Sequence, residues 1–131
     1  MKDKKTDEWL MMQYFREKYD HFPKGKLIKS ESPDFILKLN RRKSIGIELT
    51  QLDYLLKNEG INPSEMINKL IQKKEDKLRL FKKCILKEYW LIITIESKSL
   101  NEIAITDIQQ VSNYNKVFLF DVFKGRINEL I

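Results

Sequence analysis

Residues 33–50 read PDFILKLNRRKSIGIELT, two apolar stretches that are joined by a short polar turn. Strongly apolar residues recur at every second position in both stretches, at Phe35, Leu37 and Leu39 and then at Ile45, Ile47 and Leu49. This period of two predicts a β-hairpin whose strands each bury one face. Both apolar sets must share that face, because a slip of one residue would turn one strand over.

Two acids lie near the open end of this predicted hairpin. The simplest register is centred on Arg42, and it places Asp34 opposite Thr50. It also places Ile36 opposite Glu48, so the two carboxylates become diagonal neighbours about 7–8 Å apart. Two carboxylates at this separation suit a shared divalent metal ion.

The same residues carry a resemblance to a known family. Thirteen residues separate Asp34 from Glu48, with a proline before the first acid and Leu49-Thr50 after the second. The segment resembles the PD-(D/E)xK phosphodiesterase superfamily, the restriction-endonuclease-like nucleases. Pro33-Asp34 matches PD, and residues 48–50 match (D/E)xK except that threonine stands at the lysine position.

The resemblance implies both a fold and a chemistry. The fold is an α/β restriction-endonuclease-like sandwich, a central mixed β-sheet flanked by helices, with an αβββαβ core and a C-terminal helix and strand. Asp34, Glu48 and the backbone carbonyl of Leu49 would bind one Mg²⁺ or Mn²⁺, an oxygen-only site suited to hard cations. The implied activity is nuclease hydrolysis of nucleic acid, with DNA as the expected substrate, by a metal-activated water that Thr50 would hydrogen-bond.

The motif lysine stabilises charge that develops during hydrolysis, so its replacement by Thr50 requires a substitute. A long helix is predicted to start near Asn62 and Pro63, with a buried stripe formed by Ile67, Leu70, Ile71, Leu78 and Phe81. Lys74 falls inside this stripe, where a lysine must pair with an acid or reach water. Lys74 is therefore the candidate catalytic lysine, and Lys38 on the acid face of the hairpin is its rival. The alternative is that Lys74 extends past its neighbours to water at the sheet edge.

A first helix is predicted from Thr6 or Asp7 to about Tyr19. In the resembled superfamily a first helix often lends an acid to the site, which makes Glu8 the candidate additional metal ligand, with Glu17 behind it. The alternative is an exposed glutamate that is favoured by the positive start of the helix.

The remaining elements indicate the fold class. A short strand is expected at 26–29, and the nearly continuous apolar segment 88–96 predicts a strand that is buried on both faces. A helix at 106–114 and a strand at 116–123 follow. With the hairpin and the two helices above, this order predicts an α/β sandwich with a mixed sheet.

Length and charge limit the class of protein. The 131 residues, of which 42% are hydrophobic, predict a single domain over 1–131. The net charge of +6 favours an anionic partner such as nucleic acid, although lysines that only solvate helices would give the same charge. Arg41, Arg42 and Lys43 in the hairpin turn are the candidate nucleic-acid contacts. Structure-selective or nonspecific DNA cleavage is expected, and a homodimer is one assembly that would perform it.

The expected compartment is the cytoplasm. Cys84 is the single cysteine and cannot form an internal disulfide, which favours a reducing environment. The N-terminal residues carry no apolar signal core, and the longest apolar run, 89–95, is too short to span a bilayer. We therefore expect no membrane partner.

Three hypotheses from different classes follow. A metal-dependent nuclease requires Asp34 and Glu48 to converge with a lysine within reach. A catalytically inactive nuclease-like domain that binds nucleic acid or protein would have the same fold, with its acids free or salt-bridged and no lysine nearby. An unrelated α/β interaction module would not bring the two acids together.

Overall fold

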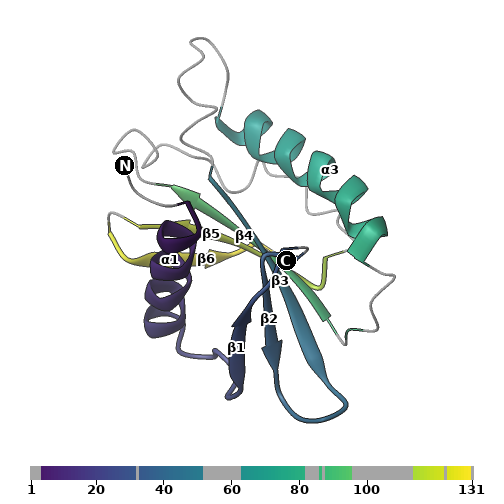
Figure 1. The fold of residues 1–131 in the computed structure, drawn as a ribbon. Coiled ribbons are helices and arrows are strands. Elements are labelled where there is room, and N and C mark those ends of the chain that lie inside the picture. The colour runs from purple at the N-terminus through teal and green to yellow at the C-terminus, as the bar shows by residue number, and fades with distance from the viewer. Residues whose placement is uncertain are drawn as a thin grey trace.

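Among the residues that the structure describes, a six-stranded mixed sheet forms the centre of the fold, with one helix on each face (Figure 1). The computed structural model describes residues 4–31, 33–51, 63–81, 86, 88–95, 114–122 and 124–130. Its elements are α1 (Lys4–Lys18), β1 (Lys26–Lys29), β2 (Phe35–Lys38), β3 (Ser44–Gln51), α3 (Pro63–Phe81), β4 (Glu88–Ile95), β5 (Lys116–Asp121) and β6 (Arg126–Glu129). The α/β class and the mixed sheet are therefore confirmed.

The strands follow one another across the sheet in chain order, from β1 to β6. β1, β2 and β3 pair antiparallel, β3, β4 and β5 pair parallel, and β6 returns antiparallel to β5. A parallel pair needs a long crossover between its strands. The segment that contains α3 provides this crossover between β3 and β4, which places α3 above the parallel part of the sheet.

Most sequence-based element bounds agree with the structure to within a few residues. β1 has the expected bounds, and β5 ends two residues earlier than expected. β4 is described from Glu88 to Ile95, and residue 96 of the expected strand lies outside the described residues. β6 is a strand that the sequence analysis did not predict. The expected helix at 106–114 lies outside the described residues, except for Tyr114, which lies two residues before the start of β5.

The hairpin register differs from the expected one by two residues. Phe35 pairs with Ile47 and Leu37 with Ile45, so the turn is centred on Arg41 instead of Arg42. A shift of two residues leaves every side chain on its expected face. When the ladder is continued by one residue, Asp34 lies directly opposite Glu48.

The side chain of Asn40 explains this register. Its Oδ1 accepts hydrogen bonds of 2.9 Å from the backbone N–H groups of both Arg42 and Lys43. Leu39 N–H donates to the carbonyl of Lys43 at 3.0 Å, which closes the turn around three residues. Asparagine side chains commonly stabilise turns in this way, and the wider turn assumed from the sequence lacked this constraint.

Two separate cores lie on the two faces of the sheet. Between α1 and the sheet the buried core is largely aromatic, and it contains Met12, Phe15, Phe35, Leu37, Trp90, Ile92, Phe118 and Phe120. Between α3 and the sheet it is largely aliphatic, and it contains Ile67, Leu70, Ile71, Leu78, Leu91, Ile93, Val117 and Leu119. The expected stripe of α3 is therefore buried at its four described positions, and Phe81 lies outside the described side chains.

Gly46 allows the segment before Asp34 to approach β3 closely. A Cβ atom at this position would lie 2.9 Å from Cγ of Pro33 and 2.8 Å from Cδ1 of Leu86. The proline ring is rigid and buried, so it cannot move aside without moving Asp34. The missing side chain at Gly46 therefore helps to set the position of the acid.

We expect Gly46→Ala to lower the free energy of unfolding by about 1–3 kcal/mol, the usual cost of overpacking a core. Chemical denaturation measures this change. Ser44→Ala on the same strand, at a half-buried position, is the control and should change stability by less than about 0.5 kcal/mol. Equal stability of Gly46→Ala and wild type would contradict the close packing of Pro33 on β3.

Candidate metal and phosphate site

Asp34 and Glu48 lie side by side where β2 begins. Oδ2 of Asp34 accepts a hydrogen bond of 2.8 Å from the backbone N–H of Leu49. The carboxylate thus replaces the backbone carbonyl that a further residue of β2 would offer to this N–H group. Glu48 is only 5% exposed, and strand alternation points its side chain toward the α3 side of the sheet.

The backbone of Leu49 adds a carbonyl oxygen to this place. In an antiparallel ladder, the N–H and C=O groups of one residue point to the same side of the strand. Because Leu49 N–H donates to Asp34, its carbonyl also points toward the Asp34 side of β3. Leu49 also lies beyond the last residue of β3 that pairs with β2, which is Ile47.

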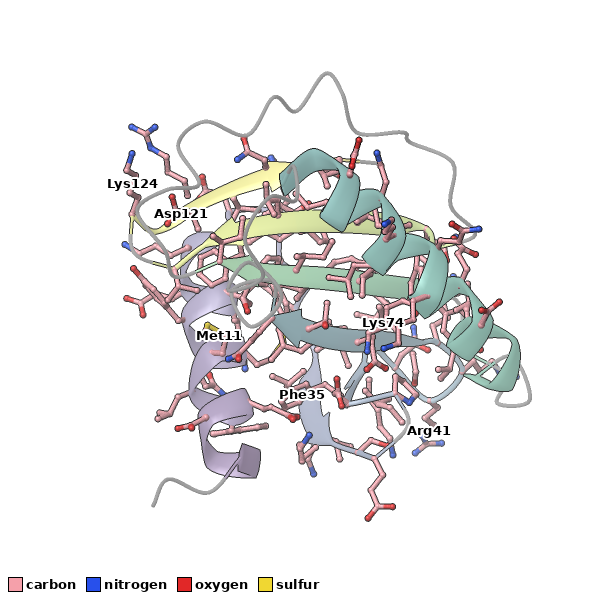
Figure 2. All side chains as sticks on the ribbon, turned by 90° about the horizontal axis from the view of Figure 1, so that it is seen from above. Met11, Phe35, Arg41, Lys74, Asp121 and Lys124 are labelled. Carbon is pink, nitrogen blue, oxygen red and sulfur yellow. The ribbon has the colours of Figure 1, made fainter. Side chains whose placement is uncertain are left out.

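Lys74 extends from the middle of α3 to Glu48. Its Nζ lies 3.5 Å from Oε1 of Glu48, and the two side chains are 11% and 7% exposed. Figure 2 shows Lys74 reaching from α3 toward the sheet. The sequence analysis left two outcomes for a lysine in the apolar stripe, pairing with an acid or extension to water. The structure shows pairing with an acid.

The rival Lys38 is exposed and lies four residues from Asp34 on β2. At about 3.3 Å per residue, this places it about 13 Å away along the strand. Arg41, Arg42 and Lys43 are exposed in the hairpin turn, still farther from the acids. Lys74 therefore lies at the acid pair, whereas the other candidate cations lie at the other end of the hairpin.

Tyr114 is a site residue that the sequence analysis missed. Its side chain is buried, and its hydroxyl donates a hydrogen bond of 3.1 Å to the backbone carbonyl of Lys74. Burial raises the pKa of the phenol, and the negative charges of Glu48, Glu75 and Asp34 raise it further. Three carboxylates, with Asp34 and Glu48 among them, thus act electrostatically on one buried phenol.

Glu8 lies close to this region but binds another partner. Its Oε2 forms an ion pair of 2.6 Å with Nζ of Lys29. The same Nζ lies 3.3 Å from the backbone carbonyl of Asp34 and 4.6 Å from the centre of the Phe35 ring. α1 is thereby linked to the segment that carries Asp34, and a metal-binding role of Glu8 stays a prediction. Glu17 is exposed.

Thr50 follows Glu48 by two residues on β3, so strand alternation places both side chains on one face. The backbone carbonyl of Thr50 accepts a hydrogen bond of 3.2 Å from the hydroxyl of Thr94. Its backbone is thus tied to β4, while its side chain is half-buried beside the acid pair. Cys84 lies outside the described residues.

The donor atoms at this place are oxygens. Among the described residues, no group of three or more histidine, cysteine or acidic side chains is arranged to hold a metal ion. Mg²⁺ commonly uses only one or two carboxylates and completes its shell with water and substrate phosphates. Asp34, Glu48 and the Leu49 carbonyl therefore have suitable chemistry for such an ion, and Lys74 brings a positive charge to the same place.

Comparisons of the chain with protein families, with curated proteins and with solved structures find no match. Within the described part of the chain, neither helix is long and apolar enough to cross a membrane. The function proposed below therefore rests on the geometry of the site.

Removing Lys74 should destabilise the protein more than removing the charge of Glu48. Lys74→Met leaves the buried carboxylate of Glu48 without this cation and should cost about 3–5 kcal/mol. Glu48→Gln reduces repulsion among the carboxylates and should cost clearly less. Urea denaturation at pH 7 measures both, with exposed Lys69→Met on the same helix as control. A smaller loss of stability in Lys74→Met than in Glu48→Gln would contradict this explanation.

Tyr114→Phe should change the dependence of stability on pH. The raised pKa of the phenol means that its contribution is fully present below pH about 10 and is lost as the pH rises further. At pH 8 the variant loses one hydrogen bond, about 1 kcal/mol. By pH 11 this difference should vanish or reverse, because only the wild type has a buried phenol that resists ionisation and thereby loses stability at this pH. Denaturation at both pH values measures this, and a constant difference would contradict a buried, acid-flanked phenol; half-buried Tyr14→Phe is the control.

Proposed function

We propose that this chain is a metal-dependent phosphodiesterase that hydrolyses nucleic acid, with DNA as the expected substrate. The observation that carries the proposal is the meeting of Asp34, Glu48 and Lys74 at one place on the sheet. Two carboxylates and a cation, largely removed from water, are the groups that such a reaction requires. Of the hypotheses above, the nuclease is the one that requires this combination.

The order of elements supports the same proposal. Among the described elements, α1, β1, β2, β3, α3 and β4 come in the order helix, three strands, helix and strand. This is the αβββαβ order of the resembled restriction-endonuclease-like nucleases. The acids also lie as that resemblance implies, one just before β2 and one on β3.

Each side chain has a distinct task in the proposed reaction. Asp34, Glu48 and the Leu49 carbonyl would hold one Mg²⁺ or Mn²⁺ ion. When bound, such an ion neutralises phosphate charge and lowers the pKa of a water molecule. Lys74 would stabilise negative charge on the phosphate, a role that Thr50 cannot take because its side chain is uncharged. Thr50 would orient a water or a phosphate oxygen by hydrogen bonding.

A second candidate function is a catalytically inactive nuclease-like module that binds nucleic acid or protein. The ion pair between Glu48 and Lys74 favours it, because a carboxylate that is held by a lysine is less available to a metal ion. The N–O distance of 3.5 Å is long for a charge-assisted hydrogen bond, which normally measures about 2.7–2.9 Å. The cleavage experiment below distinguishes the two candidate functions.

The experiment is cleavage of plasmid, linear and single-stranded DNA, and of RNA, with Mg²⁺ or Mn²⁺. We expect the wild type to cleave, and Asp34→Asn, Glu48→Gln and Lys74→Met to lose at least about 100-fold in rate. Asp76→Asn, an exposed acid on α3, is the matched control and should retain the wild-type rate.

Circular dichroism of every variant establishes that the fold is retained. Cleavage that persists in both acid variants would exclude this site as the source of the activity. Metal binding by the wild type without any cleavage would favour the inactive module. The homodimer remains a prediction that gel filtration of the same samples can test.

A further inference from the structure

Six exposed cations gather at the end of β1 and β2 that is distant from the acid pair. This hairpin-end cation cluster consists of Lys24, Lys26, Lys38, Arg41, Arg42 and Lys43. Lys26 pairs directly with Lys38 across the two strands. A Cβ atom on Gly25 would lie 2.5 Å from the backbone carbonyl of Lys38, so the chain beside Lys24 touches the same strand. The hairpin turn supplies the other three cations.

The pair Lys26–Lys38 is unfavourable by itself. Like charges that face each other across two strands repel and destabilise a sheet. Among the described residues, the ion pairs are Lys29–Glu8, Lys74–Glu48 and Lys116–Glu129, and none includes a member of the cluster. An external polyanion would remove this repulsion.

The two strand residues of the cluster, Lys26 and Lys38, lie on the same side of the sheet as the acids. Strand alternation puts Lys38 on the face of Ile36 and Asp34, and pairing puts Lys26 there too. In the described part of the chain, the core beneath α3 contains no residue of β1 or β2. Consistent with this, Ile36 is only half-buried. α3 therefore leaves this part of the face accessible from solution.

We propose that the hairpin-end cation cluster binds the phosphate backbone of nucleic acid and guides it to Asp34 and Glu48. The inference rests on the proposed function for the identity of the polyanion. One strand of a duplex carries a phosphate every 3.4 Å along its axis. Lys38, about 13 Å from Asp34, would thus contact the same backbone within a few nucleotides of the reacting phosphate.

A different role for these lysines makes the opposite prediction. β1 is an edge strand, and lysines on edge strands can prevent sheets of two molecules from pairing. In that case, neutral variants would self-associate and their affinity for nucleic acid would not change. If the lysines bind phosphate, neutral variants lose affinity, while their stability stays the same or rises because the repulsion is gone.

The test compares the wild type with the double variant Lys26→Gln/Lys38→Gln. Binding of a fluorescent 20-base-pair DNA duplex is measured by anisotropy between 50 and 300 mM NaCl with EDTA, so that no cleavage occurs. Two lost phosphate contacts should lower the slope of log K against log salt by about 2 and weaken binding by about 10–100-fold near 0.1 M salt. The melting temperature should be unchanged or higher.

Lys124→Gln is the control for a general loss of charge. Lys124 is exposed and lies on the opposite side of the molecule from Arg41 in Figure 2. An equal loss of affinity in this variant would overturn the proposal, and so would an unchanged slope in the double variant or a wild type that binds no duplex. The binding assay contains no divalent metal, so its result does not depend on cleavage. A protein that binds DNA through the cluster in this assay, but does not cleave it in the metal-containing assay above, would refute the proposed enzyme and confirm this binding surface.

Discussion

The pairing of Glu48 with Lys74 is the constraint on which the arrangement of the site depends. A carboxylate that is 5% exposed requires compensation by an opposite charge, and Lys74 supplies it from the opposite layer. α3 must therefore pass over β3 with its central turn above Glu48. The parallel crossover to β4 permits this course, and the hydrogen bond from Tyr114 to the Lys74 carbonyl holds the same turn from the β5 side.

Asp34 reaches the site by a different set of contacts. Asn40 sets the register, Gly46 leaves room for Pro33, and the carboxylate then accepts the Leu49 N–H in place of a strand partner. Lys29 holds the backbone of Asp34 from the α1 side. Both acids are thus positioned by packing from two layers, and a rigid scaffold of this kind is what electrostatic catalysis requires.

Much of this arrangement could be predicted from the sequence, because local periodicity reports burial. The alternation in β2 and β3 marked their buried faces, and the stripe in α3 marked Lys74 as a residue that needs a partner. The register could not be predicted as easily, since it depends on the side chain of Asn40. Tyr114 was missed because a buried tyrosine usually belongs to the core, and its contact with Lys74 joins residues 40 positions apart. The Lys29–Glu8 pair likewise depends on the tertiary fold.

The most direct test of the central claim is an NMR titration of ¹⁵N-labelled protein with Mn²⁺. A paramagnetic ion broadens the amide signals that lie nearest to it. If Asp34 and Glu48 form one metal site, the amides of Asp34, Leu49 and Thr50 should broaden first, and Glu48→Gln should abolish this selectivity. Broadening that begins elsewhere, or that is unchanged in Glu48→Gln, would contradict the account of these two acids as one metal and phosphate site.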